Sequence, residues 1–229
     1  MPEGTMANRI ADAARELQSE RDAQSTLDHV VKLSIELIPH AEHAGISLLH
    51  RRQRLDTPAA TSPVVADVER LQYELGEGPC LEAIFDAPIV HSDHVGNDER
   101  WPVWGPKATA DTGVRSMLCL RMFTHEQNVG ALNLYATTPG AFTETDVEHG
   151  ELLAAHSAVA VASAQQVENL QLAVDGRSVI GQAQGILMER FNIDAEHAFQ
   201  VLARVSSHSN TKLRDVAAEL IATRKTPGT

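Results

Sequence analysis

The residues best suited to chemistry lie near the C-terminal end of the chain. His197, Gln200 and Arg204 recur at three- and four-residue spacing, so they share one face of a predicted helix. A serine-rich turn and the cations Lys212 and Arg214 follow directly. Positive charge beside amide and hydroxyl groups suits the binding of phosphates and unpaired bases. The same residues also describe an ordinary solvated helix face, and spacing alone leaves both interpretations open.

Other candidates for reactivity or metal binding are weaker. Cys80 follows Gly-Pro at the start of a short helix, where a thiol pKa can fall, and the alternative is a small buried residue. His91, Asp93 and His94 could begin a metal site, but no further ligand cluster stands near them in the sequence. The chain has no GxSxG, Walker or HExxH motif. We therefore predict no catalytic residues, no metal site and no enzyme activity.

The elements that position these residues begin with a mixed region. Residues 5–38 predict one or two helices, and from about 25 to 140 helical stretches alternate with short apolar strands. The runs 114–123 and 129–137 read as a β-hairpin, whereas 51–63 reads as a polar segment with turn residues. This alternation predicts an α+β domain with an antiparallel sheet flanked by helices.

A long helix is predicted next, from an N-cap at Thr143 to about residue 174. Apolar residues recur along it at seven-residue spacing, which is typical of a coiled-coil seam between two copies of a chain. The residues of the predicted seam are Leu153, Ala160, Val167, Leu170 and Val174. The alternative is a helix that lies on the sheet of its own domain, which explains Leu152, Val159 and Val161 equally well.

The end of the chain reads as three short helices, an all-α bundle. The first covers the stretch 179–193. Asp194 is predicted to cap the second, with Phe199 and Leu202 facing inward. Asn210 or Thr211 is predicted to cap the third.

Charge and composition bound the class of protein. The 229 residues carry a net charge of −12, which by itself argues against nucleic acid. Residues 175–229, however, hold seven Lys/Arg and six Asp/Glu, so they carry +1 and permit a nucleic-acid partner. Two cysteines form no disulfide framework, and neither a signal peptide nor an apolar run of membrane length is evident. We expect a cytoplasmic protein without a membrane partner.

The last segment resembles the ANTAR domain, an RNA-binding module of bacterial antitermination regulators, in the runs IGQAQGILMERFNI, AEHAFQVLARVSS and NTKLRDVAAELI. The first part resembles a GAF sensor domain of the kind fused to ANTAR in actinobacteria, in AGISLL, LQYELGEGPCLEA, DERWPVWGPKA and GVRSMLCLRMF. The resemblance implies a helical extension over 1–24, a GAF domain over 25–165 that includes the start of the long helix, and an ANTAR domain over 166–229 with a flexible C-terminal tail.

A GAF-ANTAR regulator would bind two closely spaced stem-loops in nascent RNA and so prevent a terminator hairpin. It would act on RNA polymerase only indirectly. Two stem-loops invite two copies, so a homodimer is expected. The motifs identify no cofactor, and they leave any small-molecule ligand of the GAF domain unnamed. The resemblance assigns RNA contact to Gln184, Gly185, Arg204, Asn210, Lys212 and Arg214.

Two glycines one turn apart, Gly181 and Gly185, stand in the first ANTAR helix with Ala183 between them. Each glycine costs a helix roughly 1 kcal/mol relative to alanine. Close approach of RNA, close packing of a partner helix or fit within a crowded bundle would each explain them. Gln184 stands where ANTAR sequences usually have lysine, and its amide can still hydrogen-bond a base or phosphate.

Two other functions compete with this reading. The last two helices could form a DNA-binding helix-turn-helix, although the turn over 206–210 is longer than usual for that motif. Alternatively, the GAF domain could bind a small molecule while the tail only assembles dimers.

Overall fold

A five-stranded antiparallel sheet forms the centre of the first of two compact units, Met1–Gln165. The computed structural model describes residues 6–20 and 22–224. Its strands are β1 (His43–Leu49), β2 (Leu55–Ala60), β3 (Ile89–Ser92), β4 (Ser116–Phe123) and β5 (Asn128–Ala136). They lie in the order β2-β1-β5-β4-β3, and every neighbouring pair is antiparallel. The predicted hairpin is the pair β4–β5.

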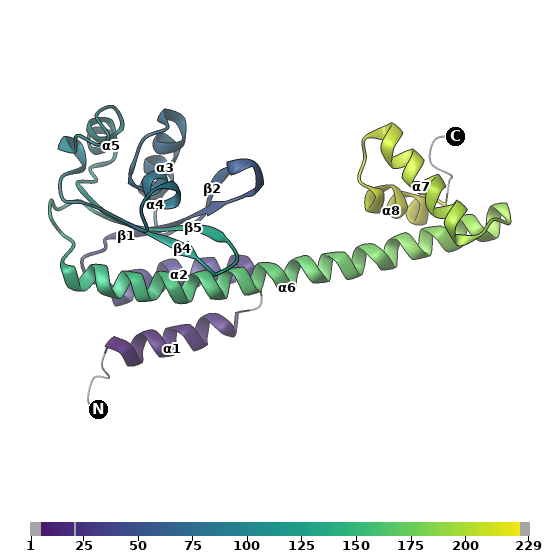
Figure 1. Cartoon of the computed structure of the whole chain (residues 1–229), viewed down its shortest axis with the longest axis horizontal. Coiled ribbons are helices and arrows are strands. Elements are labelled where there is room, and N and C mark those ends of the chain that lie inside the picture. The colour runs from purple at the N-terminus through teal and green to yellow at the C-terminus, as the bar shows by residue number, and fades with distance from the viewer. Residues whose placement is uncertain (1–5, 21, 225–229) are drawn as a thin grey trace. The chain divides into compact units, whose positions relative to one another are not determined.

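Helices cover both faces of this sheet (Figure 1). One face carries α2 (Ala23–Leu37) and the first part of α6 (Glu144–Phe191), with α1 (Met6–Gln18) packed on α2. The other face carries α3 (Pro63–Leu75), α4 (Pro79–Phe85) and α5 (Trp104–Thr112), and short 3-10 turns occur at Arg51–Gln53 and Val95–Asn97. Successive strand side chains point to opposite faces. Leu118 and Leu120 therefore join the first core, while Met117 and Cys119 join the second.

The predicted fold class is confirmed, with one correction in the segment 51–63. This segment reads as a polar connection, but part of it forms the edge strand β2, which pairs with β1. Only Ala59 of β2 is buried, so the strand carries no alternation of apolar and polar residues. Pro58 is tolerated because an edge strand leaves one side of its backbone unpaired.

The long helix brings a second correction. The sequence predicts one helix to about residue 174 and another from 179, whereas α6 runs without interruption through Gly176. Gly176 is buried, and a Cβ there would lie 3.8 Å from Cδ of Arg214 in the first turn of α8 (Leu213–Thr223). Packing by α8 thus compensates for the weak helix propensity of glycine.

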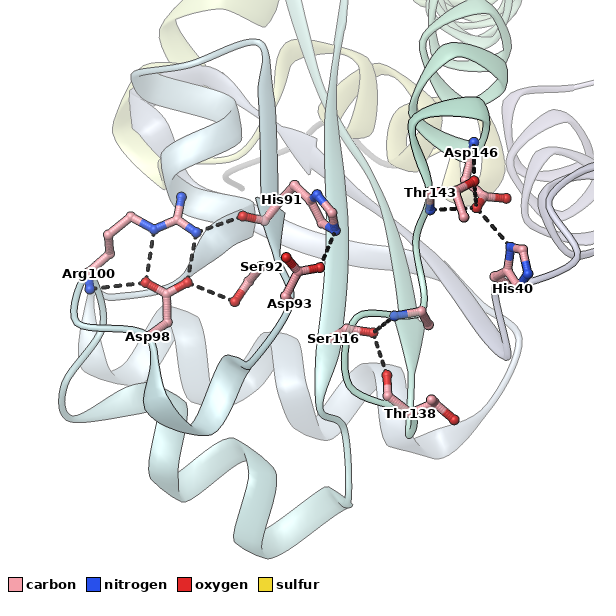
Figure 2. A network of polar contacts seen from close by, with 11 residues as sticks. His40, His91, Ser92, Asp93, Asp98, Arg100, Ser116, Thr138, Thr143 and Asp146 are labelled. Atoms are coloured by element: carbon pink, nitrogen blue, oxygen red, sulfur yellow. Dashed lines mark hydrogen bonds and ion pairs between the residues drawn. The ribbon is translucent and has the colours of Figure 1, made fainter.

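A capping box fixes the start of α6 (Figure 2). Thr143 Oγ1 accepts a hydrogen bond from Asp146 N at 3.3 Å, and Asp146 Oδ2 accepts one from Thr143 N at 2.7 Å. His40 Nδ1 lies 2.8 Å from the same Oδ2, which ties the loop after α2 to the helix. Burial raises the pKa of Asp146, but these hydrogen bonds outweigh that effect and hold the pKa below its ordinary value.

A second network holds the loop between β3 and α5 (Figure 2). Arg100 donates to the two carboxylate oxygens of Asp98 at 2.9 and 2.7 Å, and to the His91 carbonyl at 2.7 Å. Ser92 Oγ also donates to Asp98, at 2.7 Å. Arg100 thereby holds the pKa of Asp98 below its usual range. Its guanidinium lies 4.3 Å from the ring centroid of the buried Trp101.

The C-terminal unit, Gln166–Thr229, consists of the last part of α6, α7 (Ala195–Ser209) and α8. Its core residues are Ala183, Leu187, Ala198, Leu202, Val216, Ala217 and Leu220. Asp194 caps α7 as predicted, since its Oδ1 accepts a hydrogen bond from His197 N at 2.8 Å. The flexible tail expected at the end of the chain falls on residues 225–229, which lie outside the described residues.

Two predictions about this unit are wrong. Phe199 was expected to face inward but is 43% exposed, because Ala198 and Leu202 form the buried stripe and the next residue is rotated by about 100°. Asn210 does not cap α8, and neither does the residue after it. Asn210 instead ends α7 in the left-handed conformation at φ 51°, and Lys212 is the N-cap of α8.

Candidate functional site

Four of the six residues predicted to contact RNA gather where α7 meets α8. Arg204 lies in the last part of α7, Asn210 and Lys212 lie in the connection, and Arg214 lies in the first turn of α8. All four side chains are exposed. Ser206 Oγ donates to a carbonyl of the connection at 2.6 Å and so holds it against α7. We call these four residues the connection cluster.

The other two predicted residues lie apart from the connection cluster. Gln184 Nε2 donates to the carbonyl of Ala195 at 2.9 Å, which places this amide at the opposite end of α7. With a rise of about 1.5 Å per residue, the two ends of α7 are about 20 Å apart. Gly185 follows Gln184 on α6 and is exposed. The predicted RNA-binding set is therefore two separate groups within one unit.

Gly181 and Gly185 of α6 do not serve packing within the described residues. Gly181 and Gly185 are exposed, and a Cβ at either position would meet no atom within 4 Å. Ala183, between them, is fully buried in the core. Fit within a crowded bundle therefore does not explain the two glycines. The other two explanations, close approach of RNA and close packing of a partner helix, both stay open.

Of the cations that the structure describes, some pair with a carboxylate and others do not, and the first unit holds both kinds. In the first unit, Lys107 contacts Asp111 at 3.0 Å and Arg100 contacts Asp98. Within the described part of the C-terminal unit, the three cations of the connection cluster form no ion pair with a carboxylate. Their charge is therefore available to a phosphate.

The predicted dimer seam is corrected in its first half. Leu153 and Ala160 are only 1% and 8% exposed and belong to the core of the first unit, so they cannot contact a second copy. Val167, Leu170 and Val174 are 66%, 60% and 60% exposed. We call these three residues the α6 stripe.

The alternative position for the long helix, on the sheet of its own domain, holds only in part. Val161 is buried against the sheet, as that alternative requires. Leu152 and Val159, which it also places against the sheet, are about half exposed. The first part of α6 therefore packs on the sheet through the face of Leu153 and Val161.

A buried polar network lies between α3 and the sheet. The Glu69 carboxylate is fully buried and accepts hydrogen bonds from Tyr135 OH at 2.6 Å, Gln72 Nε2 at 2.7 Å and Ser47 Oγ at 2.9 Å. Asn133 Nδ2 donates to Ser47 Oγ at 3.0 Å. Its Oδ1 is buried, with no hydrogen-bond partner among the described residues. The chain's own polar groups thus occupy the interior of this face.

Tyr73 links this network to the surface. Its hydroxyl donates to Ser47 Oγ at 2.7 Å and lies 2.8 Å from Thr57 Oγ1. The same residue lines a surface cavity of about 360 Å³, together with Thr57, Ala66, Arg70 and Glu74. Tyr73 therefore stands between this cavity and the buried network.

Burial dominates the electrostatics of the network. It raises the pKa of Glu69 above its ordinary value, although hydrogen bonds from Tyr135 and other donors oppose the shift. Burial, and then the charge of Glu69, raise the pKa of Cys80 well above its ordinary value. Cys80 is therefore the small buried residue of the two alternatives, and burial favours the protonated thiol.

Replacing Glu69 by Gln is expected to change how stability depends on pH. Because the folded-state pKa of Glu69 is raised, protonated Glu69 contributes stability that is complete below the ordinary pKa of 4.5 and is lost as pH rises through the folded value. The amide does not titrate. Each tenfold difference in proton affinity between the two states is worth about 1.4 kcal/mol.

The measurement is urea unfolding of both proteins between pH 4.5 and 8. The wild type should lose stability relative to Glu69→Gln as pH rises, while contributions from all other groups cancel in the difference. Two curves that stay parallel would contradict a raised pKa.

The residues considered for metal binding do not converge. His91 Nε2 lies 3.2 Å from Asp93 Oδ1, and the His91 ring packs edge-on against Phe142 at 6.3 Å. In the parts of the chain that the structure describes, no three His, Cys, Asp or Glu side chains gather as metal ligands.

Glu69 and Gln72 were missed at the level of sequence. The signal was present, because both fall on the face of α3 marked by Val65 and Val68, at spacings of three, four and seven. A carboxylate and an amide on an otherwise apolar face predict buried hydrogen bonds.

Two family models match the chain. The GAF domain model matches residues 20–162, and the ANTAR domain model matches residues 168–221. No curated protein matches it.

Several solved structures share the fold. The GAF domain of an Acinetobacter phosphoenolpyruvate-protein phosphotransferase is 19% identical, with a TM-score of 0.57 over 73% of this chain and 99% of its own. A free methionine-R-sulfoxide reductase from Neisseria meningitidis, solved with its substrate, is 16% identical, with a TM-score of 0.56 over 73% and 96%. A bacteriophytochrome from R. palustris is 11% identical, with a TM-score of 0.61 over 88% and 47%. At these identities the similarity shows the fold alone.

Among the residues that the structure describes, no helix is both long and apolar enough to cross a membrane. The GAF match extends over more than half of the chain, and the ANTAR match lies within the C-terminal unit. The chain therefore belongs to the GAF family and carries a GAF domain over residues 20–162 followed by an ANTAR domain over residues 168–221.

Proposed function

We propose that the protein is an RNA-binding transcription antitermination regulator and not an enzyme. Its ANTAR domain binds paired stem-loops in nascent RNA and prevents a terminator from forming, under control of the GAF domain. The observation that carries the proposal is the connection cluster, whose three cations are exposed and form no ion pair with a carboxylate among the described residues. Phosphate contacts by such cations supply most of the affinity for nucleic acid.

The protein acts as a homodimer in this proposal. Two stem-loops call for two ANTAR domains, and the α6 stripe offers an exposed apolar surface at coiled-coil spacing. Linking two modules raises the overall affinity because the second contact becomes intramolecular. The GAF domain senses a small molecule or a protein partner.

A DNA-binding helix-turn-helix is the competing function. The connection between α7 and α8 covers only residues 210–212, so the expectation of an overlong turn was wrong and turn length does not exclude DNA. The exposed face of α8 is the stronger argument. It carries the carboxylates of Asp215 and Glu219 beside two alanines, which makes a poor reading helix for a major groove lined by phosphates.

The test is binding of the full-length protein to a two-stem-loop RNA, to each stem-loop alone and to a matched DNA duplex, over a series of salt concentrations. We expect tight binding to the paired stem-loops only. Lys212→Ala and Arg204→Ala should each weaken binding several-fold and reduce the salt slope by about 0.7–0.9 per lost phosphate contact.

Arg54→Ala is the matched control, since it removes an exposed arginine from the first unit. It should leave binding unchanged. Equal affinity for the DNA duplex would favour the helix-turn-helix. Absence of nucleic-acid binding from a folded protein would favour a ligand-binding GAF protein whose tail only dimerises.

A further inference from the structure

Phe199 is an exposed aromatic residue in a small unit whose hydrophobic core is itself small. It is 43% exposed, whereas Ala198 and Leu202 on either side of it in the helix are fully buried. Phenylalanine side chains normally supply a large share of the apolar area that a core buries. Phe191, at the end of α6, is also exposed, at 50%, so two aromatic side chains of this unit are available for an external contact.

The surroundings of Phe199 suit a planar polar molecule. Phe199 follows Ala195 by one helical turn, so both lie on the same face of α7. The Ala195 carbonyl is held by Gln184 Nε2 at 2.9 Å, and Gln184 Oε1 accepts no hydrogen bond among the described residues. Beside Gln184, the exposed Gly185 leaves open space above α6. The Phe199 ring and the Gln184 amide thus lie near the same end of α7, whereas Gly185 stands about 200° from the buried Ala183 around α6 and faces away from the core.

The charge of the same helix points to nucleic acid as the occupant. Arg204 lies five residues beyond Phe199, about 7.5 Å along α7 and about 140° around it, and forms no ion pair among the described residues. The α6 stripe, which we assign to the dimer, lies on a different helix from Phe199 and precedes Gly176 in the sequence. A phosphate at Arg204 and an unpaired base at Phe199 are within reach of one RNA loop.

We propose that Phe199 is the stacking surface for an unpaired loop base of the bound RNA, and that Gln184 hydrogen-bonds the edge of that base. This proposal rests on the proposed RNA-binding function and names the part of the RNA that is recognised. Bases of single-stranded loops stack on aromatic side chains, and amides read their exposed edges.

The test compares Phe199→Ala, Phe199→Leu and Phe199→Trp in the full-length protein, with the two-stem-loop RNA. Stacking predicts binding that is about 5- to 150-fold weaker for the alanine variant, nearly as weak for leucine, and close to wild type for tryptophan. The salt slope should stay at the wild-type value in all three variants, because stacking releases no counterions. An RNA with a fluorescent adenine analogue in the loop should show a change in emission on binding that is lost with Phe199→Ala.

Phe123→Ala is the matched control, since Phe123 is 56% exposed in the first unit. It should bind as the wild type does.

Wild-type binding by Phe199→Leu would overturn stacking. A lower molecular mass of Phe199→Ala by light scattering would assign the ring to self-association instead. If the wild type binds RNA and Lys212→Ala weakens it while the Phe199 variants do not, only this proposal fails. If the wild type binds no RNA, the proposed function fails with it.

Discussion

Replacing Leu170 and Val174 by glutamate is expected to convert a dimer into monomers and to weaken binding to two-stem-loop RNA by roughly two orders of magnitude or more. Both side chains are 60% exposed in the α6 stripe, so the change should leave the fold of each unit intact. In a dimer the introduced charges would face each other across an apolar seam, where burial of unpaired carboxylates is unfavourable.

Light scattering gives the molecular mass, and RNA binding gives the affinity on the same samples. Affinity for a single stem-loop should be unchanged, because each ANTAR domain stays folded and only the second, intramolecular contact is lost. Leu172→Glu is the matched control. Leu172 is 48% exposed and lies two residues from Leu170, so it stands about 200° away, on the opposite side of α6.

Two outcomes would count against the α6 stripe. Dissociation by Leu172→Glu to the same extent would mean that charge on α6, and not the stripe, controls assembly. A variant that stays dimeric would place the interface elsewhere on the chain.

Local patterns were enough to predict most of the fold. The apolar runs of β4 and β5 on either side of a turn, the helical repeat of α3 and the cap at Asp194 are each encoded within a few residues. β2 could not be predicted in this way, because an edge strand with one buried residue carries no period. The continuity of α6 at Gly176 depends on α8, which lies more than thirty residues away in the sequence.

The site was predicted as a set of residue types but not as an arrangement. The connection cluster follows from sequence because its members lie within eleven residues of one another. The position of Gln184 at the far end of α7 depends on how α6 and α7 pack. Phe199 shows the same limit, since a helical repeat fixes the spacing of a buried stripe but leaves its width to the neighbouring helices.

The glycines of α6 allow a second prediction, in which stability and function change in opposite directions. The double variant Gly181→Ala, Gly185→Ala should raise the free energy of unfolding of the C-terminal unit by about 2 kcal/mol, because each alanine favours the helix by about 1 kcal/mol. Neither glycine has a positive φ, and neither Cβ would meet an atom within 4 Å. RNA binding should nevertheless weaken, since two methyl groups would stand on the surface where we place the RNA.

The control is Gly130→Ala, which makes the same chemical change at a position that needs glycine. Gly130 has a φ of 149°, and a Cβ there would overlap the backbone carbonyl oxygen of Ser47 in the neighbouring strand. That variant should lose several kcal/mol of stability, because strand backbone cannot move aside cheaply.

A double variant of α6 that is also less stable would show that the glycines are needed by the chain itself. A more stable variant that binds RNA normally but no longer dimerises would assign them to a partner helix. Only greater stability together with weaker RNA binding by an intact dimer would mean that the glycines keep α6 open to RNA.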